Sequence, residues 1–257
     1  MRTNAAARGE ELSGRVALVT GAAQGLGAAI GEAMARAGAC VWLADVDPAV
    51  RAVADGLRAQ GLEIGAIMAD VRDEAEWRRM LEEAAGARGY VDVLVNNAAR
   101  TPSTSLWDIS VAEWDDVMAV NLRGVFLGCR AAGEHMRAHG RGGRIINMAS
   151  LAGQQASRAT GAHYAASKAG ILALTRSFAL ELAGDDVTVN ALAPATVRSP
   201  ALDRLDPDTQ RTLLGSIPLT RFGAPQEVAG AAVFLAGASG AYITGACLDI
   251  NGGRLMR

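Results

Sequence analysis

The chain has 257 residues and a mass of 26.5 kDa, with 50% hydrophobic residues and a formal net charge of −2. This length suffices for one α/β domain with a sizeable core, so we expect one domain rather than two. A small net charge with both signs interspersed excludes the basic footprint of a nucleic-acid-binding protein.

Targeting signals and metal-binding patterns are missing from the sequence. No run of about 18 apolar residues occurs, so we expect no membrane span. The first residues, MRTNAAARGEELSGR, lack the apolar segment of a secretory signal, so we expect a cytoplasmic protein. The three cysteines are far apart and the three histidines lack zincin-like spacing, so we expect no metal site. Residues 1–12 are expected to form a flexible tail.

Short apolar runs alternate with segments of helical periodicity along the chain. Strands are expected at 16–19, 40–44, 64–68, 91–95, 144–148, 187–192 and 246–250. Helices are expected at 25–38, 48–60, 73–87, 110–138, 163–183, 200–214 and 225–237. Strands that are apolar on both faces and alternate with helices predict a doubly wound parallel sheet of about seven strands, with helices on both faces. We therefore expect a single α/β domain of Rossmann type over 13–257, with a mobile lid near 200–214.

A glycine-rich turn, TGAAQGLG, links the first strand to the first helix. Such glycines permit a tight turn and let backbone N–H groups approach a pyrophosphate at the helix N-terminus. The spacing is G-x-x-x-G-x-G, and an ordinary strand-to-helix turn is the alternative. The strand before the turn and the helix after it favour dinucleotide binding, with contacts expected from Gly21, Gln24, Gly25, Leu26 and Gly27.

Acidic residues end the next two strands. Asp45 could accept hydrogen bonds from both adenosine ribose hydroxyls and would repel a 2′-phosphate, which predicts NAD rather than NADP. Gln24 agrees, because the loop holds no arginine for such a phosphate; a solvated strand-end carboxylate is the alternative. Asp70, with Val71 beside it, could bind the adenine amino group. Asn97 and Ala98 follow the fourth strand at the edge where ligands of open sheets lie, although asparagines can equally tie down a turn.

Tyr164 and Lys168 lie four residues apart, on one face of a predicted helix. Lys168 is the single lysine among 25 basic residues, so a chain that otherwise uses arginine places its lysine here. A nearby ammonium stabilises phenolate and lowers a tyrosine pKa, and the same lysine could bind the cofactor ribose. An incidental lysine on a surface helix is the alternative. We expect Tyr164 and Lys168 to transfer the proton.

Three further polar residues surround this pair. Ser150 ends the fifth strand, and its hydroxyl could orient a carbonyl or alcohol oxygen towards Tyr164. Asn121 lies inside the long helix at 110–138, where asparagine is a mediocre residue unless its amide is used; it could hold a water that relays protons from Lys168. His163 adjoins Tyr164 but points about 100° away on the helix, so we expect a partly exposed side chain.

These motifs together resemble the short-chain dehydrogenase/reductase family, over about residues 13–253. The T-G-x-x-x-G-x-G turn, the N-N-A segment, the helical asparagine, the serine after strand five and Y-x-x-x-K appear in the family's order. The resemblance implies a single-domain Rossmann fold and reversible hydride transfer between a nicotinamide and a carbonyl or secondary alcohol. It assigns Asn121, Ser150, Tyr164 and Lys168 as the catalytic tetrad.

The resemblance also implies further contacts and an assembly. Pro194 is similar to the family's proline after strand six, and Val197 and Ser199 would hold the nicotinamide carboxamide. The family is usually tetrameric, so a homotetramer is implied. Ala99 and Ala195 stand where the family usually has glycine. The separation of Ser150 and Tyr164 is one residue longer than expected, in the loop at 151–161 that should line the substrate pocket.

The substrate has two readings. The NAD preference favours a small polyol, sugar-like or hydroxy-alicyclic alcohol. The alternative is a 3-oxoacyl thioester, because the overall likeness is to ketoacyl-carrier reductases. Those reductases usually prefer NADPH and carry a basic residue before strand six for their acidic carrier, where this chain has Ala183-Gly184-Asp185-Asp186. A non-catalytic dinucleotide sensor is a more remote possibility, since such a protein should lose Tyr164 or Lys168.

Overall fold

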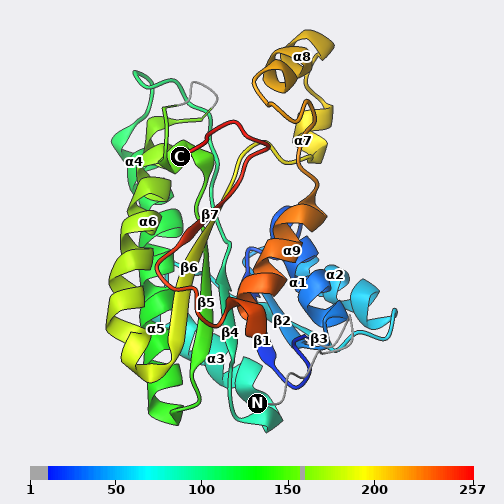
Figure 1. Cartoon of the computed structure of the whole chain (residues 1–257), viewed down its shortest axis with the longest axis vertical. Coiled ribbons are helices and arrows are strands. Elements are labelled where there is room, and N and C mark those ends of the chain that lie inside the picture. Colours follow the sequence, from blue (N-terminus) through cyan, green and yellow to red (C-terminus); the bar gives the residue numbers. More distant parts are fainter. Residues whose placement is uncertain (1–10, 157–159) are drawn as a thin grey trace.

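The computed structural model describes residues 11–156 and 160–257. In this part of the chain, one parallel sheet has the order β3-β2-β1-β4-β5-β6-β7 (Figure 1). Its strands are β1 (Val16–Thr20), β2 (Cys40–Asp45), β3 (Ile64–Met68), β4 (Val93–Asn96), β5 (Gly143–Met148), β6 (Val187–Pro194) and β7 (Cys247–Ile250). The predicted doubly wound sheet is confirmed, with strand boundaries that differ from the predicted ones by at most two residues.

Helices cover both faces of the sheet (Figure 1). One face carries α1 (Gly25–Arg36), α2 (Ala49–Arg58) and α9 (Pro225–Ala236), and the other carries α3 (Glu74–Ala85), α5 (Gly124–His139) and α6 (Ala162–Leu182). The remaining helices are α4 (Val111–Met118), α7 (Pro200–Asp203) and α8 (Pro207–Gly215), with short 3-10 turns at 86–88, 151–153, 183–185 and 238–240. Helices α7 and α8 project beyond the sheet at the end where the strands finish.

Successive side chains of each strand point to opposite faces of the sheet and pack in two separate apolar cores. Leu18 packs with Trp77 and Met136 on one face, whereas its neighbour Val19 packs with Ile30 and Leu235 on the other. These side chains are at most 1% exposed. Full burial stabilises each by about 1.5–3 kcal/mol, which explains why strands apolar on both faces select this architecture.

The long helix expected at 110–138 is divided. A π-helical turn at Ala119–Arg123 separates α4 from α5, and Asn121 lies in it. The helix expected at 200–214 is also divided, because Asp206 caps a new helix that starts at Pro207. A proline supplies no backbone donor and suits a first helical turn, so the break falls just before it.

The flexible tail expected over residues 1–12 includes a residue, Leu12, that belongs to the folded domain. Residues 1–10 lie outside the described residues, but Leu12 is fully buried in the core beneath α1, and its backbone N–H donates to the Ala37 oxygen at 2.9 Å. Its apolar side chain therefore belongs to the domain. None of the described helices combines the length and the apolarity needed to cross a bilayer.

The contact between α5 and α3 leaves no room for a side chain at Gly128. A Cβ there would overlap Asn96 and the Trp77 ring. We expect Gly128→Ala to lower the free energy of unfolding by about 1–3 kcal/mol, because buried neighbours must shift. The matched control is Gly56→Ala on α2, where no atom lies within 4 Å of the new Cβ; it should raise stability by about 0.5–1 kcal/mol. Urea denaturation measures both, and equal shifts in one direction would contradict the packing described.

Candidate active site

The turn after β1 requires glycine for two physical reasons. Gly21 and Gly25 have φ angles of +66° and +59°, a region that disfavours side chains. In addition, a Cβ at Gly21 would overlap the backbone of Ala98, and one at Gly27 would overlap the Gly21 carbonyl oxygen. The turn is therefore packed tightly against the end of β4, with its backbone N–H groups at the start of α1, which fits a pyrophosphate.

Hydrogen bonds join the carboxyl ends of β1 and β4, where the strand order reverses. The Thr20 hydroxyl accepts from the backbone N–H groups of Asn97 and Ala98, at 3.1 and 3.2 Å. The Asn97 amide donates to the carbonyl oxygens of Thr20 and Gly21, at 3.0 and 2.9 Å. Asn97 thus ties down the turn, which is one of the two roles that the sequence left open for it. Thr20 has the same role, which the sequence did not predict.

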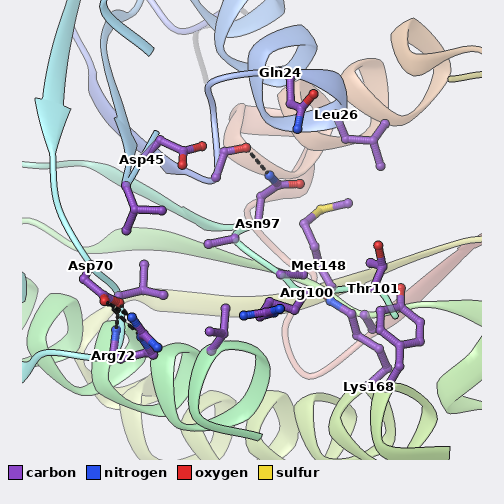
Figure 2. Close-up of a pocket in the computed structure, with 18 of the residues that line it drawn as sticks. Gln24, Leu26, Asp45, Asp70, Arg72, Asn97, Arg100, Thr101, Met148 and Lys168 are labelled. Atoms are coloured by element: carbon purple, nitrogen blue, oxygen red, sulfur yellow. Dashed lines mark hydrogen bonds and ion pairs between the residues drawn. The ribbon is translucent and has the colours of Figure 1, made fainter. Parts of the chain in front are cut away.

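A cavity of about 540 Å³ opens at this edge of the sheet, a volume typical of ligand sites. Figure 2 shows Gln24 and Asp45 near one end and Lys168 near the other. The expected residues that line it are Gly21, Gln24, Leu26, Asp45, Asp70, Val71, Asn97, Ala98, Tyr164, Lys168 and Pro194. Gly25 and Gly27 only shape the turn, and Val197 and Ser199 are not among its described lining residues; Ser199 instead caps α7 through the Leu202 N–H.

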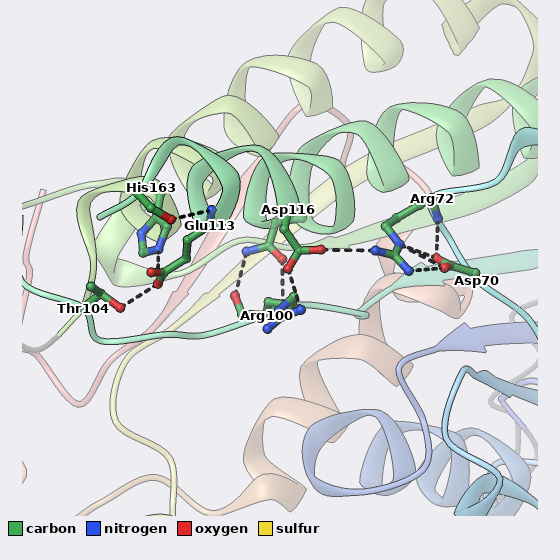
Figure 3. A network of polar contacts seen from close by, with 9 residues as sticks. Asp70, Arg72, Arg100, Thr104, Glu113, Asp116 and His163 are labelled. Atoms are coloured by element: carbon green, nitrogen blue, oxygen red, sulfur yellow. Dashed lines mark hydrogen bonds and ion pairs between the residues drawn. The ribbon is translucent and has the colours of Figure 1, made fainter. Parts of the chain in front are cut away.

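Two arginines that the sequence did not single out also line the cavity. Arg72 binds both carboxylate oxygens of Asp70 and holds the pKa of that carboxyl below its usual value. Arg72 and Arg100 share Asp116, at 3.1 and 2.5 Å (Figure 3). Among the described residues, no arginine is paired with Asp45; its carboxylate accepts from the backbone N–H groups of Ala23 and Asp47, at 2.9 and 3.0 Å. The Asp45 end of the cavity therefore presents a carboxylate oriented by the backbone.

Tyr164 and Lys168 face the far end of the cavity from one turn of α6. Lys168 is 3% exposed, and its Nζ donates to the Met148 carbonyl oxygen and lies 5.6 Å from the Tyr164 ring centre. The Ser150 hydroxyl accepts from the Ala152 N–H at 3.1 Å and is close enough to Tyr164 to affect the pKa of its phenol. Residues expected on separate strands and helices are thus brought together in one cluster.

Burial controls the proton affinities in this cluster. It raises the pKa of Tyr164, which the nearby Ser150 hydroxyl only partly opposes, and it lowers the pKa of Lys168 to about 8. From the sequence, the ammonium is expected to lower the tyrosine pKa. That expectation is not met in the structure, because the amine is turned towards Met148. The phenol therefore keeps its proton at neutral pH.

Asn121 is fully buried, and its amide is already engaged. Its oxygen accepts from the Arg100 N–H at 2.8 Å, and its nitrogen donates to the Arg100 carbonyl and to the Ser167 hydroxyl, at 2.9 and 3.1 Å. Ser167 in turn donates to the Tyr164 carbonyl at 2.7 Å. The structure favours a positioning role for this amide over the direct hold on a relay water that the sequence suggested.

The expectation of a partly exposed His163 is wrong. The side chain is fully buried, and its Nε2 lies 3.0 Å from the Glu113 carboxylate. The helix turns this residue away from the cavity, as expected, but α4 covers it on that side. The sequence could not predict that α4 covers His163, because Glu113 lies fifty residues earlier in the chain.

The chain matches the family model described as enoyl-(acyl carrier protein) reductase over residues 21–254. The 3-oxoacyl-(acyl-carrier-protein) reductase FabG of Staphylococcus aureus (strain Mu50 / ATCC 700699) is 39% identical over 242 residues, which are 93% of this chain and 98% of the relative. A (hydroxy(phenyl)methyl)succinyl-CoA dehydrogenase subunit of Thauera aromatica is 36% identical, over 95% of this chain and 98% of its own.

Solved structures agree with these relatives. A 3-oxoacyl-(acyl-carrier protein) reductase from Brucella melitensis superimposes with a TM-score of 0.90 at 31% identity, over 96% of this chain and 94% of that chain. A putative gluconate dehydrogenase from Agrobacterium tumefaciens has a TM-score of 0.90 at 33% identity, over 97% and 99% of the two chains.

The chain belongs to the short-chain dehydrogenase/reductase family. As a short-chain dehydrogenase/reductase it is an oxidoreductase that acts on carbonyl or hydroxyl groups with a nicotinamide dinucleotide. The site fits that cofactor: a turn with glycine at 21, 25 and 27 lies at the N-terminus of α1, and the carboxylates of Asp45 and Asp70 line the same cavity.

Proposed function

We propose that this short-chain dehydrogenase/reductase reduces 3-oxoacyl thioesters reversibly to 3-hydroxyacyl thioesters. The observation that carries the reaction type is the pair of Tyr164 and Lys168 at one end of a cavity whose other end carries Asp45, with Ser150 beside Tyr164. The thioester substrate is supported by the relatives, several of which are named as 3-oxoacyl-(acyl-carrier-protein) reductases, with a CoA-thioester dehydrogenase subunit also among them. This reading replaces the polyol as the first candidate.

The side chains divide the proton chemistry among them. When bound, the nicotinamide dinucleotide supplies the hydride for the substrate's carbonyl carbon. The Tyr164 phenol, which is protonated at neutral pH, donates its proton to the carbonyl oxygen, and the Ser150 hydroxyl donates a second hydrogen bond that orients this oxygen. The Lys168 ammonium stabilises the phenolate that remains. Asn121, through Arg100 and Ser167, keeps the surrounding backbone in place.

We infer that the cofactor is NAD rather than NADP. The Asp45 carboxylate would accept hydrogen bonds from the ribose hydroxyls and repel a 2′-phosphate. Gly21, Gln24, Gly25, Leu26 and Gly27 would form the pyrophosphate turn. Asp70 and Val71 would hold the adenine, and Asn97, Ala98, Pro194, Val197 and Ser199 would lie along the nicotinamide half. A reductase structure from Brucella melitensis with bound NAD, at 31% identity, supports this cofactor.

A polyol or sugar-acid alcohol is the second candidate. The likeness to a putative gluconate dehydrogenase favours it.

The charge before β6 bears on the form of the thioester substrate. Carrier-protein reductases usually have a basic residue there, whereas this chain has the acidic pair Asp185 and Asp186. This pair argues against an acidic carrier protein and favours a free CoA thioester. Residues 200–214 are proposed as a lid over the substrate, and a homotetramer is proposed from the family alone.

A substrate panel beside Tyr164→Phe tests the reaction. Acetoacetyl-CoA, an acyl-carrier thioester and gluconate should be assayed through NADH absorbance, with the CoA thioester expected to turn over fastest. Tyr164→Phe should lower kcat by about 10³-fold, since it removes the proton donor. The control is Tyr242→Phe, whose side chain is fully exposed. Turnover of gluconate alone would favour the second candidate, and NAD binding without any turnover would favour a sensor.

Cofactor choice depends on the charge at the end of β2. We expect Asp45→Asn to lower kcat/KM for NADH by about 10-fold and to raise it for NADPH, because the repulsion disappears. Asp47→Asn, two residues away and exposed, is the matched control and should change neither value. Steady-state kinetics with both cofactors measure this. A wild-type enzyme that prefers NADPH would overturn the role given to Asp45.

The two directions of reaction should respond oppositely to pH. Reduction needs the Tyr164 phenol protonated and Lys168 charged. Its kcat/KM should stay constant at neutral pH and fall above about pH 8, as Lys168 loses its proton. Oxidation needs the phenolate beside a charged Lys168, so its rate should rise with pH up to about pH 8 and then level off. Initial rates in both directions between about pH 6 and pH 10 measure this; a reduction rate that climbs through this interval would contradict the assignment.

A further inference from the structure

The segment after β4 forms a wall shared by two cavities. Arg100 and Thr101 line the cavity of about 540 Å³ described above. Ser103, Thr104 and Leu106 line a second cavity of about 580 Å³, together with Thr160 and Ala165 from the loop before α6 and its first turn. The second cavity is bounded by the first turn of α6, the helix that carries Tyr164, whereas Tyr164 itself lines the first cavity. The position of segment 100–104 therefore sets the shape of both.

The first end of this wall is held by Asn121. Its buried amide binds both the N–H and the carbonyl of Arg100, which fixes the backbone where the segment leaves the sheet. This attachment lies on the dinucleotide side and leaves residues 102–104 unrestrained by it.

The second end is held by a carboxylate shared between three elements (Figure 3). One oxygen of Glu113, on α4, accepts from the Thr104 hydroxyl at 2.6 Å and lies 3.0 Å from Nε2 of His163, on α6. The Thr104 bond and the histidine hold the pKa of this carboxyl below its usual value, so it is charged. The Gly161 N–H adds a bond to the Pro102 carbonyl at 3.3 Å. The wall is thereby fastened to the start of α6, next to Tyr164.

The burial of His163 indicates that this bond matters. The ring is fully buried, and no described atom pairs with its Nδ1. Burying such a group is costly, and an apolar side chain would fill the space without that cost. Gly161 makes room for the ring, since a Cβ there would overlap it. The site is built around an imidazole whose one described polar contact is Glu113.

We propose that His163 is a positioning residue, which through Glu113 fixes the 102–104 wall of the substrate cavity against the helix that carries Tyr164. This inference rests on the proposed function, because a fixed wall matters to an enzyme that must hold its substrate beside Tyr164. It acts on substrate binding and leaves the cofactor end, held by Asn121, unchanged.

Two readouts test the proposal, one of which needs no turnover. In His163→Phe, which keeps a buried ring without a donor, amide hydrogen exchange at Gly161, whose N–H is bonded to the Pro102 carbonyl, should rise about tenfold, because the wall loses an attachment. KM for the thioester should rise about tenfold while kcat stays within about twofold and the Kd for NADH is unchanged. His163→Gln, whose amide can reach Glu113, should restore both readouts. His139→Gln, at the exposed end of α5, is the matched control and should change neither.

A second variant covers the case in which His163→Phe does not fold. Thr104→Val removes the other bond to Glu113 with little change of shape and should give the same exchange and KM shifts. Unchanged exchange at Gly161 in the folded variants would overturn the proposal, as would a loss of kcat at constant KM. A wild-type protein that turns over no thioester would remove the proposed function, while the exchange measurement would still decide whether His163 holds the wall.

Discussion

The site depends on the hydrogen bonds that join the carboxyl ends of β1 and β4 through Thr20 and Asn97. At this point the strand order reverses, so neighbouring helices leave to opposite faces and a crevice opens between them. The bonds hold the Gly21 turn so close to Ala98 that a Cβ at Gly21 would overlap the Ala98 backbone. This junction therefore positions the glycine turn at one end of the cavity. It also positions the start of the wall segment at Arg100.

Burial then sets the protonation states of Tyr164 and Lys168. The same low-polarity surroundings that lower the pKa of Lys168 to about 8 raise that of Tyr164, so the pair rests as ammonium and neutral phenol at neutral pH. A neutral phenol beside Ser150 is a proton donor, which suits carbonyl reduction better than alcohol oxidation. This resting state supports the proposed direction of reaction, and the relatives named as 3-oxoacyl reductases support the proposed thioester substrate.

The π-helical turn at Ala119–Arg123 and the buried His163 both help to hold the segment after β4 in place. The first brings the Asn121 amide to the backbone of Arg100, and the second brings an imidazole to the carboxylate that holds Thr104. Both attach the same connecting segment to helices that pack on one face of the sheet. A loop between a strand and a helix is thereby held at both ends, which suits a segment that lines an active site.

The sequence by itself determined the sheet, the glycine turn and the Tyr164–Lys168 pair, because strand periodicity, turn chemistry and helical spacing act over a few neighbouring residues. Only the tertiary structure decided the break in the helix at 110–138, the burial of His163, the ion pairs of Arg72 and Arg100, and the raised pKa of Tyr164. Each of these depends on partners from distant parts of the chain, and their effects on burial and charge exist only after the fold brings them within a few ångströms.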